Sequence, residues 1–254
     1  MRYKITLSYD GSAFCGWQIQ PHDPSVQQTL EEALSRLTGE PVKVVGAGRT
    51  DTGVNASSYV AHFDCCTAAD CAQLRCKLNA ILPQTIAVQS VEEADPEFHA
   101  RFDAIHREYT YFLHTVKDPF LVSHSYLCTF PLDFEKMNEA ARHLLGTHDF
   151  SSFEKVGADN KTSICTVTKA FWEQYTPNVC SGNTGSYWRF NIGADRFLRN
   201  MVRAITGTLI EVGRGKRSPE SIPELLEARD RCSAGESVPG HALFLTGIEY
   251  PISR

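Results

Sequence analysis

The sequence predicts an α+β protein whose two halves repeat one order of elements: strand, helix, strand, strand, helix, strand. Two observations support this prediction. Apolar residues alternate with polar ones where strands are expected, and they recur every three or four residues where helices are expected. The same order occurs in residues 1–104 and again in residues 105–254, which we expect to form two domains. Such an order is typical of a ferredoxin-like arrangement, an antiparallel sheet with helices on one face.

The first half begins with an alternating strand from Arg2 to Tyr9. A helix is expected from Ser25, because the apolar residues that follow it share one helical face: Val26, Leu30, Ala33, Leu34 and Leu37. Ser25 and Gln28 form a capping box. The other expected elements are strand Val42–Val45, strand Ser57–Phe63, a helix around Ala69–Leu82 and strand Thr85–Val91.

The second half has elements of the same kinds. They are strand Arg107–Thr115, helix Asp133–Leu145, strands Cys165–Tyr175 and Ser186–Ile192, helix Arg196–Val212, a shorter helix from Ser218 and strand Phe244–Tyr250. Within the helix expected at 196–212, the spacing of Arg196, Arg199 and Arg203 places these three side chains on one face.

The composition is that of an ordinary globular protein. The chain has 254 residues, of which 42% are hydrophobic and 22% are charged. It contains no run of about 18 apolar residues, so no membrane span is expected. Its first residues lead into a strand and not into a signal peptide. We therefore expect a cytoplasmic protein.

The nine cysteines are an odd number in a chain without a secretion signal, and we expect reduced thiols. Four of them form a cluster in the sequence: Cys65, Cys66, Cys71 and Cys76. Their spacing lacks the paired C-x-x-C of zinc sites. Incidental thiols are therefore favoured over a metal centre.

The net charge of −5 argues mildly against a nucleic-acid partner, because phosphate binding depends on lysine and arginine. Local basic clusters could still provide such a surface. They are Arg101/His106/Arg107, Lys155/Lys161, Arg196/Arg199/Arg203 and Arg214/Lys216/Arg217. Each cluster taken singly is more often a solvated face of the protein.

The most informative segment is the glycine-rich loop Gly46–Val54, which brackets Arg49 and Asp51 with three glycines. It does not fit a dinucleotide fingerprint, since Asp51 stands where the third glycine belongs and a strand follows instead of a helix. A structural turn in which Arg49 pairs with Asp51 is one interpretation. A catalytic loop is the other, because functional residues concentrate on loops held by rigid elements.

Eight motifs in order resemble the TruA-type family of tRNA pseudouridine synthases, and together they span essentially the whole chain. They are Tyr9-Asp10-Gly11 to Gly16-Trp17-Gln18, Ser25-Val26-Gln27, Gly48-Arg49-Thr50-Asp51-Thr52-Gly53-Val54, His62-Phe63 with Asn79 to Pro83, Phe98-His99-Ala100-Arg101-Phe102, Arg107-Glu108-Tyr109-Thr110-Tyr111, His148 to Phe153, and Met201-Val202-Arg203. One departure is Thr52-Gly53-Val54-Asn55, where the family commonly has Ala-Gly-Val-His. Any role of that histidine is either absent or taken by the Asn55 amide.

The resemblance implies the pseudouridine synthase fold, with two ferredoxin-like halves and an active-site cleft between them. It implies an isomerase that acts on uridines 38, 39 and 40 in the anticodon stem-loop of tRNA, as a homodimer and without a metal or other cofactor. Asp51 would be the essential carboxylate. The substrate-binding residues would be Arg49, Tyr109, Arg203 and Leu245, and the RNA contacts would be Phe98, His99, Ala100, Arg101, Phe102 and Lys155.

Two other functions compete with this one. A tandem ferredoxin-like protein could bind RNA without catalysis, although the intact set Arg49, Asp51, Tyr109 and Arg203 argues against it. A carboxylate-dependent hydrolase of small nucleosides is the third hypothesis. The basic clusters and the lack of a clear second acid for the leaving group argue against the hydrolase.

Overall fold

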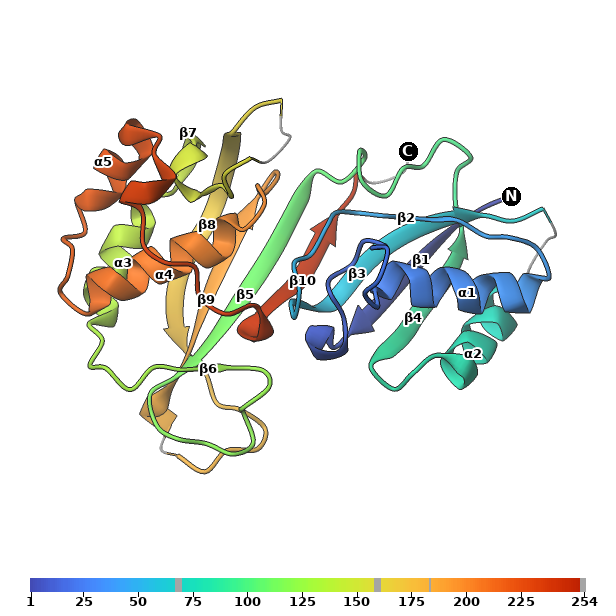
Figure 1. Cartoon of the computed structure of the whole chain (residues 1–254), viewed down its shortest axis with the longest axis horizontal. Coiled ribbons are helices and arrows are strands. Elements are labelled where there is room, and N and C mark those ends of the chain that lie inside the picture. Colours follow the sequence, from blue (N-terminus) through green and yellow to red (C-terminus); the bar gives the residue numbers. More distant parts are fainter. Residues whose placement is uncertain (67–69, 158–160, 183, 252–254) are drawn as a thin grey trace. The chain divides into compact units, whose positions relative to one another are not determined.

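The computed structural model describes residues 1–66, 70–157, 161–182 and 184–251. These residues form five α-helices and a mostly antiparallel set of strands, so the predicted α+β class is confirmed. The chain divides into two compact units (Figure 1). The first unit comprises Met1–His106 with Phe244–Arg254, and the second unit comprises Arg107–Leu243.

The sheet of the first unit is built around β1 (Arg2–Tyr9), which pairs antiparallel with β3 (Asn55–Asp64) and β4 (Ile86–Glu93). The other side of β3 pairs with β2 (Val44–Gly46), again antiparallel. The order β4-β1-β3-β2 is that of a ferredoxin-like sheet. In addition, β10 (Leu243–Glu249) from the end of the chain pairs in parallel with the beginning of β3.

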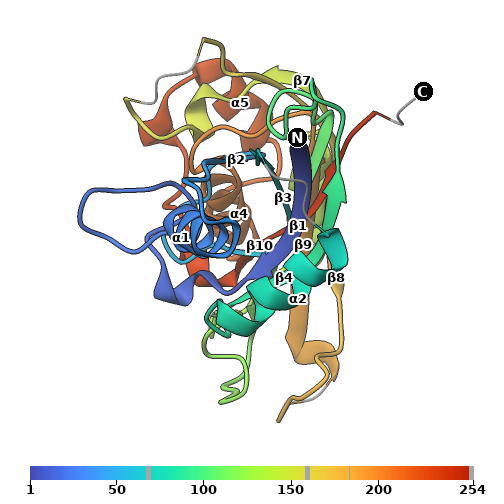
Figure 2. The same ribbon diagram turned by 90° about the vertical axis from the view of Figure 1, so that its right-hand side faces the viewer.

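Two helices cover this sheet, and α1 lies on one of its faces (Figures 1 and 2). α1 (Val26–Thr38) begins at Ser25, whose Oγ accepts a hydrogen bond from the Gln28 backbone N–H at 3.2 Å. The Gln28 side chain bonds Glu32 instead of returning to Ser25, so only this half of the predicted capping box forms. α2 (Cys71–Ile81) begins at Asp70, whose side chain caps it.

The predicted first residue of α2, Ala69, lies outside the described residues. The remaining expected elements of the first unit occur within a few residues of their predicted bounds. Three alternate residues of β1 are fully buried, and so are three apolar residues of α1, which makes the sheet–helix interface the core of this unit: Tyr3, Ile5 and Leu7, and Val26, Leu30 and Leu34.

The sheet of the second unit has the antiparallel order β5 (His106–His114), β9 (Tyr187–Ala194), β8 (Ile164–Gln174) and β7 (Gly146–Asp149). A two-residue strand, β6 (Tyr126–Leu127), pairs in parallel with β5. β6 and β7 were not predicted, because two to four residues are too short to show a period of two.

Helices α3 (Phe134–Arg142), α4 (Met201–Gly213) and α5 (Ser221–Ala228) lie on one side of this second sheet (Figure 1). α4 begins five residues later than predicted. Asn200 has φ 68°, a left-handed conformation that stops a helix from continuing backward, and Asn tolerates it better than most residues.

The late start of α4 corrects one expectation. Arg196 and Arg199 precede the helix, so they do not share a helical face with Arg203. In the part of the chain that the structure describes, no helix is long and apolar enough to cross a membrane.

Candidate active site

The loop that joins β2 to β3, here called the Asp51 loop (residues 46–54), lies against the loop that follows β1. Two glycines of the latter make this approach possible. A Cβ on Gly11 would lie 2.2 Å from the carbonyl oxygen of Val54, and one on Gly16 would lie 2.3 Å from that of Thr50. Gly16 also has φ +92°, which residues with a side chain rarely adopt. The two loops can therefore pack this closely only with glycine at both positions.

Backbone hydrogen bonds join the same two loops. The Trp17 N–H donates to the Thr50 carbonyl, and the Gly53 N–H donates to the Phe14 carbonyl, both at 3.3 Å. A further bond, from the Val54 N–H to the Asp51 carbonyl at 3.1 Å, closes a turn within the Asp51 loop. The backbone around the carboxylate is thus fixed from both sides.

Three buried aromatic residues pack together and contact the Asp51 loop: Tyr9, Trp17 and Tyr59. The rings of Trp17 and Tyr59 stack with centroids 4.0 Å apart. The Tyr59 hydroxyl donates to the Gly48 carbonyl, and the hydroxyls of Tyr9 and Thr50 are hydrogen bonded at 2.9 Å. The two tyrosines therefore combine packing with a side-chain hydrogen bond to a defined position of the loop, whereas the Trp17 ring contributes packing.

The Asp51 side chain is half-buried, and Arg49 is exposed two residues earlier. A carboxylate on a rigid loop can approach a reacting carbon or accept a proton without first being ordered. An exposed guanidinium beside it can bind a phosphate or stack on a base. The arrangement therefore suits chemistry on a nucleotide bound over the loop.

Asn55, the residue that departs from the family pattern, is buried at the end of the loop. Its Oδ1 accepts a hydrogen bond from the Gly11 N–H at 2.8 Å. The amide thus ties the Asp51 loop to the loop after β1, which is a structural role. Leu245 reaches the same end of the loop, because β10 pairs it with Ala56, and its side chain is only 3% exposed.

In the second unit, Tyr109 and Tyr111 on β5 differ in their surroundings. Tyr111 is fully buried, and its hydroxyl donates to the Pro239 carbonyl at 3.1 Å. Burial raises the pKa of this hydroxyl above its ordinary value. Tyr109 is half-buried and packs edge-on against Phe197, with centroids 5.1 Å apart. Of the two rings, Tyr109 has the accessible surface that stacking on a base would need.

Arg203 lies in the first turn of α4, where its Nε donates to the Val238 carbonyl at 2.8 Å. This bond orients the guanidinium. The segment that carries Val238 approaches α4 closely because residue 207 is glycine; a Cβ there would lie 1.8 Å from the Glu236 carbonyl oxygen. Sequence reasoning did not single out Gly207, since an isolated glycine in a helix gives no indication of its neighbour.

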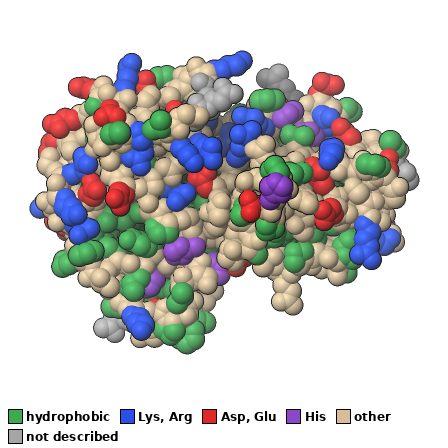
Figure 3. All heavy atoms as spheres, viewed as in Figure 1, with side chains coloured by type: hydrophobic (Ala, Val, Ile, Leu, Met, Phe, Trp, Pro, Cys, Tyr) green, Lys and Arg blue, Asp and Glu red, His purple; other side chains and the backbone are tan. Residues whose placement is uncertain are grey.

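The residues predicted to contact RNA fall into two groups. Among Phe98–Phe102, only Arg101 and Phe102 are exposed, whereas Ala100 is buried. Lys155 is exposed in the second unit, and its backbone N–H donates to the Arg199 carbonyl at 3.0 Å. The structure thereby brings together the backbones of one residue from each of two basic clusters that the sequence separates. On the face shown in Figure 3, Lys and Arg side chains gather in groups with acidic side chains between them.

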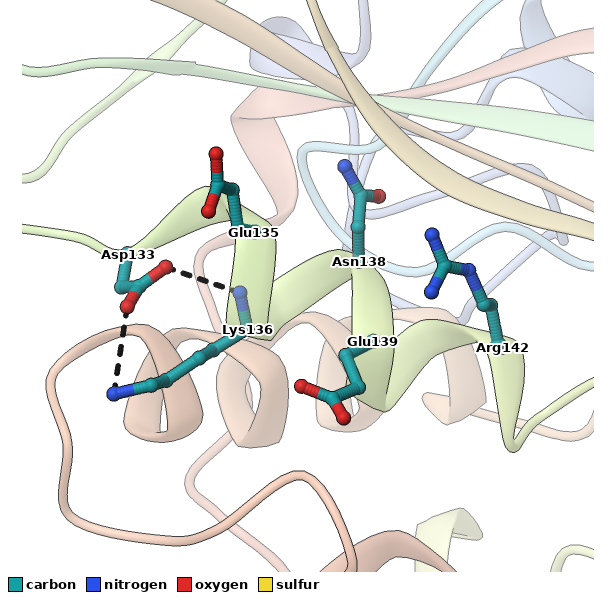
Figure 4. Close-up of a pocket in the computed structure, with 6 residues that line it drawn as sticks. All are labelled: Asp133, Glu135, Lys136, Asn138, Glu139 and Arg142. Atoms are coloured by element: carbon teal, nitrogen blue, oxygen red, sulfur yellow. Dashed lines mark hydrogen bonds and ion pairs between the residues drawn. The ribbon is translucent and has the colours of Figure 1, made fainter.

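A shallow hollow of about 630 Å³ lies outside all of these residues, along α3. Figure 4 shows its lining, which includes the ion pair between Lys136 and Asp133 at 3.5 Å. The charged helical residues of this lining are the exposed outer face of an amphipathic helix: Glu135, Lys136, Glu139 and Arg142. Among the clustered cysteines, Cys65 is buried and its thiol lies 2.9 Å from the Glu40 carboxylate, so it contributes to packing.

Comparison with known proteins finds similarity over nearly the whole chain. A family model described as tRNA pseudouridine synthase matches residues 5–103 and 140–251. Proteins named tRNA pseudouridine synthase A are similar as well. The protein from Parabacteroides distasonis is 51% identical over 253 residues, which is 98% of this chain and 96% of that protein. The one from Bacteroides thetaiotaomicron is 50% identical, covering 98% and 91%. The one from Bacillus subtilis is 42% identical, covering 98% and 99%.

Proposed function

Because the chain belongs to the tRNA pseudouridine synthase family and is an isomerase of tRNA uridines, we propose that it acts on positions 38, 39 and 40 of the anticodon stem-loop, with Asp51 as the essential carboxylate. The reaction breaks the N-glycosidic bond, turns the uracil and rejoins it through carbon. The product has the same atoms as the substrate, so no redox equivalent is consumed.

The observation that supports Asp51 most strongly is the way its loop is held. Close glycine contacts and backbone hydrogen bonds fix the loop, while the carboxylate itself is only half-buried. Such a group can act as nucleophile or as base at the sugar or the uracil ring. The same fixed Asp51 carboxylate would serve each of three steps: attack on the sugar C1′, addition to the uracil C6, or removal of a ribose proton.

The target nucleotide must leave the stack before it can react. We propose that Arg49 supports the extruded state, that Tyr109 stacks on the uracil and that Leu245 contacts it. Arg203 would pair with the Asp51 carboxylate. Support for the last two roles comes from orientation: β10 pairs Leu245 beside the end of the Asp51 loop, and Val238 fixes the Arg203 guanidinium.

We also propose that the protein is a homodimer in the cytoplasm. Light scattering of the purified protein tests the first point, and fractionation of cells tests the second. A monomer at the concentrations used for catalysis would contradict the homodimer.

Undermodified tRNA incubated with the protein tests the function itself. We expect pseudouridine at positions 38, 39 or 40, mapped by chemical modification and primer extension. Pseudouridine at other positions alone would contradict the proposed site. Binding of tRNA without modification would indicate an RNA-binding module. Release of free uracil would indicate a hydrolase.

A further inference from the structure

The segment Phe98–Asp103 of the first unit exposes an aromatic ring that the proposed reaction does not use. The Phe102 side chain is 74% exposed. Single exposed apolar residues are common on protein surfaces, so exposure alone indicates no function. What distinguishes Phe102 is the set of groups that hold it and its backbone in place.

The ring of Phe102 is supported by its neighbours. The His99 ring packs against it in a tilted arrangement, with centroids 4.3 Å apart and an interplanar angle of 33°. The Arg101 guanidinium carbon lies over the Phe102 ring, 5.6 Å from its centroid, which is within cation–π range. The result is a supported aromatic surface with a cation beside it, which matches the charge and shape of a nucleotide.

The backbone beneath this ring is fixed at each end of Ala100. Its N–H donates to the Nδ1 of buried His62 at 3.1 Å, and its carbonyl accepts the Tyr250 hydroxyl at 2.7 Å. The Nδ1 of His99 accepts the N–H groups of both Arg101 and Phe102 at 3.2 Å. The backbone of this segment is thus held by side chains from three separate parts of the chain: His62, His99 and Tyr250.

We propose that Phe102, supported by His99 and flanked by Arg101, is a stacking platform for an unpaired tRNA base other than the reacting uridine, and that His62 is its positioning residue. Arg101 binds the adjacent phosphate. Every base has a π-face, so the platform adds affinity without reading sequence. This inference rests on the proposed function only in that the ligand is tRNA.

The first experiment compares three variants, Phe102→Ala, Phe102→Leu and Phe102→Tyr, with Phe120→Ala as the matched control. Phe120 is 61% exposed and lies in the second unit. The ligand is a tRNA transcript with cytidine at positions 38–40, so binding is measured without turnover. Loss of one stacked base raises the Kd about 5- to 150-fold. We expect this for Ala and Leu, and less than a twofold change for Tyr and for the control.

A Phe102→Ala protein that folds normally and binds as tightly as wild type would overturn the platform. Equal Kd values for Leu and Tyr would also overturn it, because apolar contact would then suffice without a ring. A direct measurement places the fluorescent base 2-aminopurine at unpaired positions of the tRNA, one at a time. We expect one position at which the fluorescence falls when the wild-type protein binds and does not fall when Phe102→Leu binds. Absence of any such position contradicts the proposal.

The second experiment tests His62 as a positioning residue. His62→Asn keeps an acceptor near Nδ1, whereas His62→Leu removes it. We expect His62→Leu to raise the Kd, His62→Asn to restore it, and Phe102→Ala to add little to His62→Leu, because both changes remove one platform. If His62 had only a structural role, His62→Leu would lower the Tm, and the effects of His62→Leu and Phe102→Ala on the Kd would add.

If His62→Leu does not fold, Tyr250→Phe replaces it in this experiment. Tyr250→Phe removes only the hydroxyl that donates to the Ala100 carbonyl. A Kd equal to wild type in that variant would contradict the positioning of the segment. These binding measurements are independent of catalysis. A wild-type protein that binds tRNA through Phe102 but forms no pseudouridine would therefore refute the proposed function and leave the platform standing.

Discussion

At the scale of single residues, the structure explains choices that the sequence left open. Asn55 replaces a common histidine, and its amide bonds the Gly11 N–H, so it keeps the loop in place. Tyr109 and Tyr111 alternate onto one face of a strand, and only burial distinguishes them. Neither burial nor the partner of Asn55 could be predicted, because both depend on segments distant in the sequence.

Substitutions at the two tyrosines should separate stacking from packing. Tyr109→Phe should bind tRNA nearly as well as wild type, whereas Tyr109→Ala should lose about 1–3 kcal/mol of binding free energy. Tyr111→Ala should lower the free energy of unfolding by about 3–5 kcal/mol, because its ring is fully buried. Binding assays and urea unfolding measure the two effects. If Tyr111→Ala abolishes catalysis in a stable protein while Tyr109→Ala does not, the assignment of the stacking residue is wrong.

Protonation of His62 should destabilise the protein in mild acid. Burial, followed by the nearby Arg2 and His99 charges, lowers the His62 pKa from 6.5 to about 4. As the pH falls from about 6.5 to about 4, the unfolded chain takes up the proton first, so stability is lost through this window. Between pH 7 and pH 4.5 the loss attributable to His62 should be roughly 2–3 kcal/mol. Urea unfolding of wild type and His62→Asn gives the difference; equal losses would contradict it.

At the scale of elements, the order of strands and helices could be predicted because each long element repeats its hydrophobic period several times. The start of α4 could not be predicted, because residues Arg196 to Met201 also fit a helical pattern. Only the left-handed conformation of Asn200 separates them from the helix, which begins at Met201. The Asp51 loop shows the same limit. Its glycines are visible in the sequence, but Gly11 and Gly16, which set its position, belong to another loop.

Alanine at these glycines should show which contacts hold the Asp51 loop. Gly16→Ala should lower both the turnover number and the free energy of unfolding, the latter by more than about 1 kcal/mol, because it adds a Cβ against a backbone oxygen at positive φ. Gly48→Ala is the matched control within the loop, since nothing lies within 4 Å of its Cβ position. Gly48→Ala should keep near wild-type stability. A Gly16→Ala protein as active and stable as Gly48→Ala would show that the close approach is dispensable.

At the scale of the whole molecule, the fold class and the family follow from motifs along the full chain, whereas the division into domains remains a prediction. We propose residues 1–104 and 105–254 as the domains, although β10 comes from the end of the chain and pairs with β3 of the first unit. Charge is also a whole-molecule property: the net charge is −5, yet Lys and Arg side chains gather in groups on the face shown in Figure 3.

Binding of tRNA should therefore weaken steeply as salt rises, in spite of the negative net charge. Each duplex phosphate that lysine or arginine neutralises contributes roughly −0.9 to the slope of log affinity against log salt concentration. Filter binding across a range of potassium chloride concentrations measures this slope. A nearly flat dependence would contradict an RNA surface built from the basic clusters.

The most direct test of the central claim is the turnover of Asp51→Asn, with Asp133→Asn as control. Both replace a carboxylate by an amide of nearly the same shape, and Asn caps a helix as well as the Asp133 that begins α3. We expect Asp51→Asn to fold and bind tRNA like wild type but to form no pseudouridine at positions 38–40, while Asp133→Asn remains active. Pseudouridine formation by Asp51→Asn within tenfold of the wild-type rate would contradict Asp51 as the essential carboxylate.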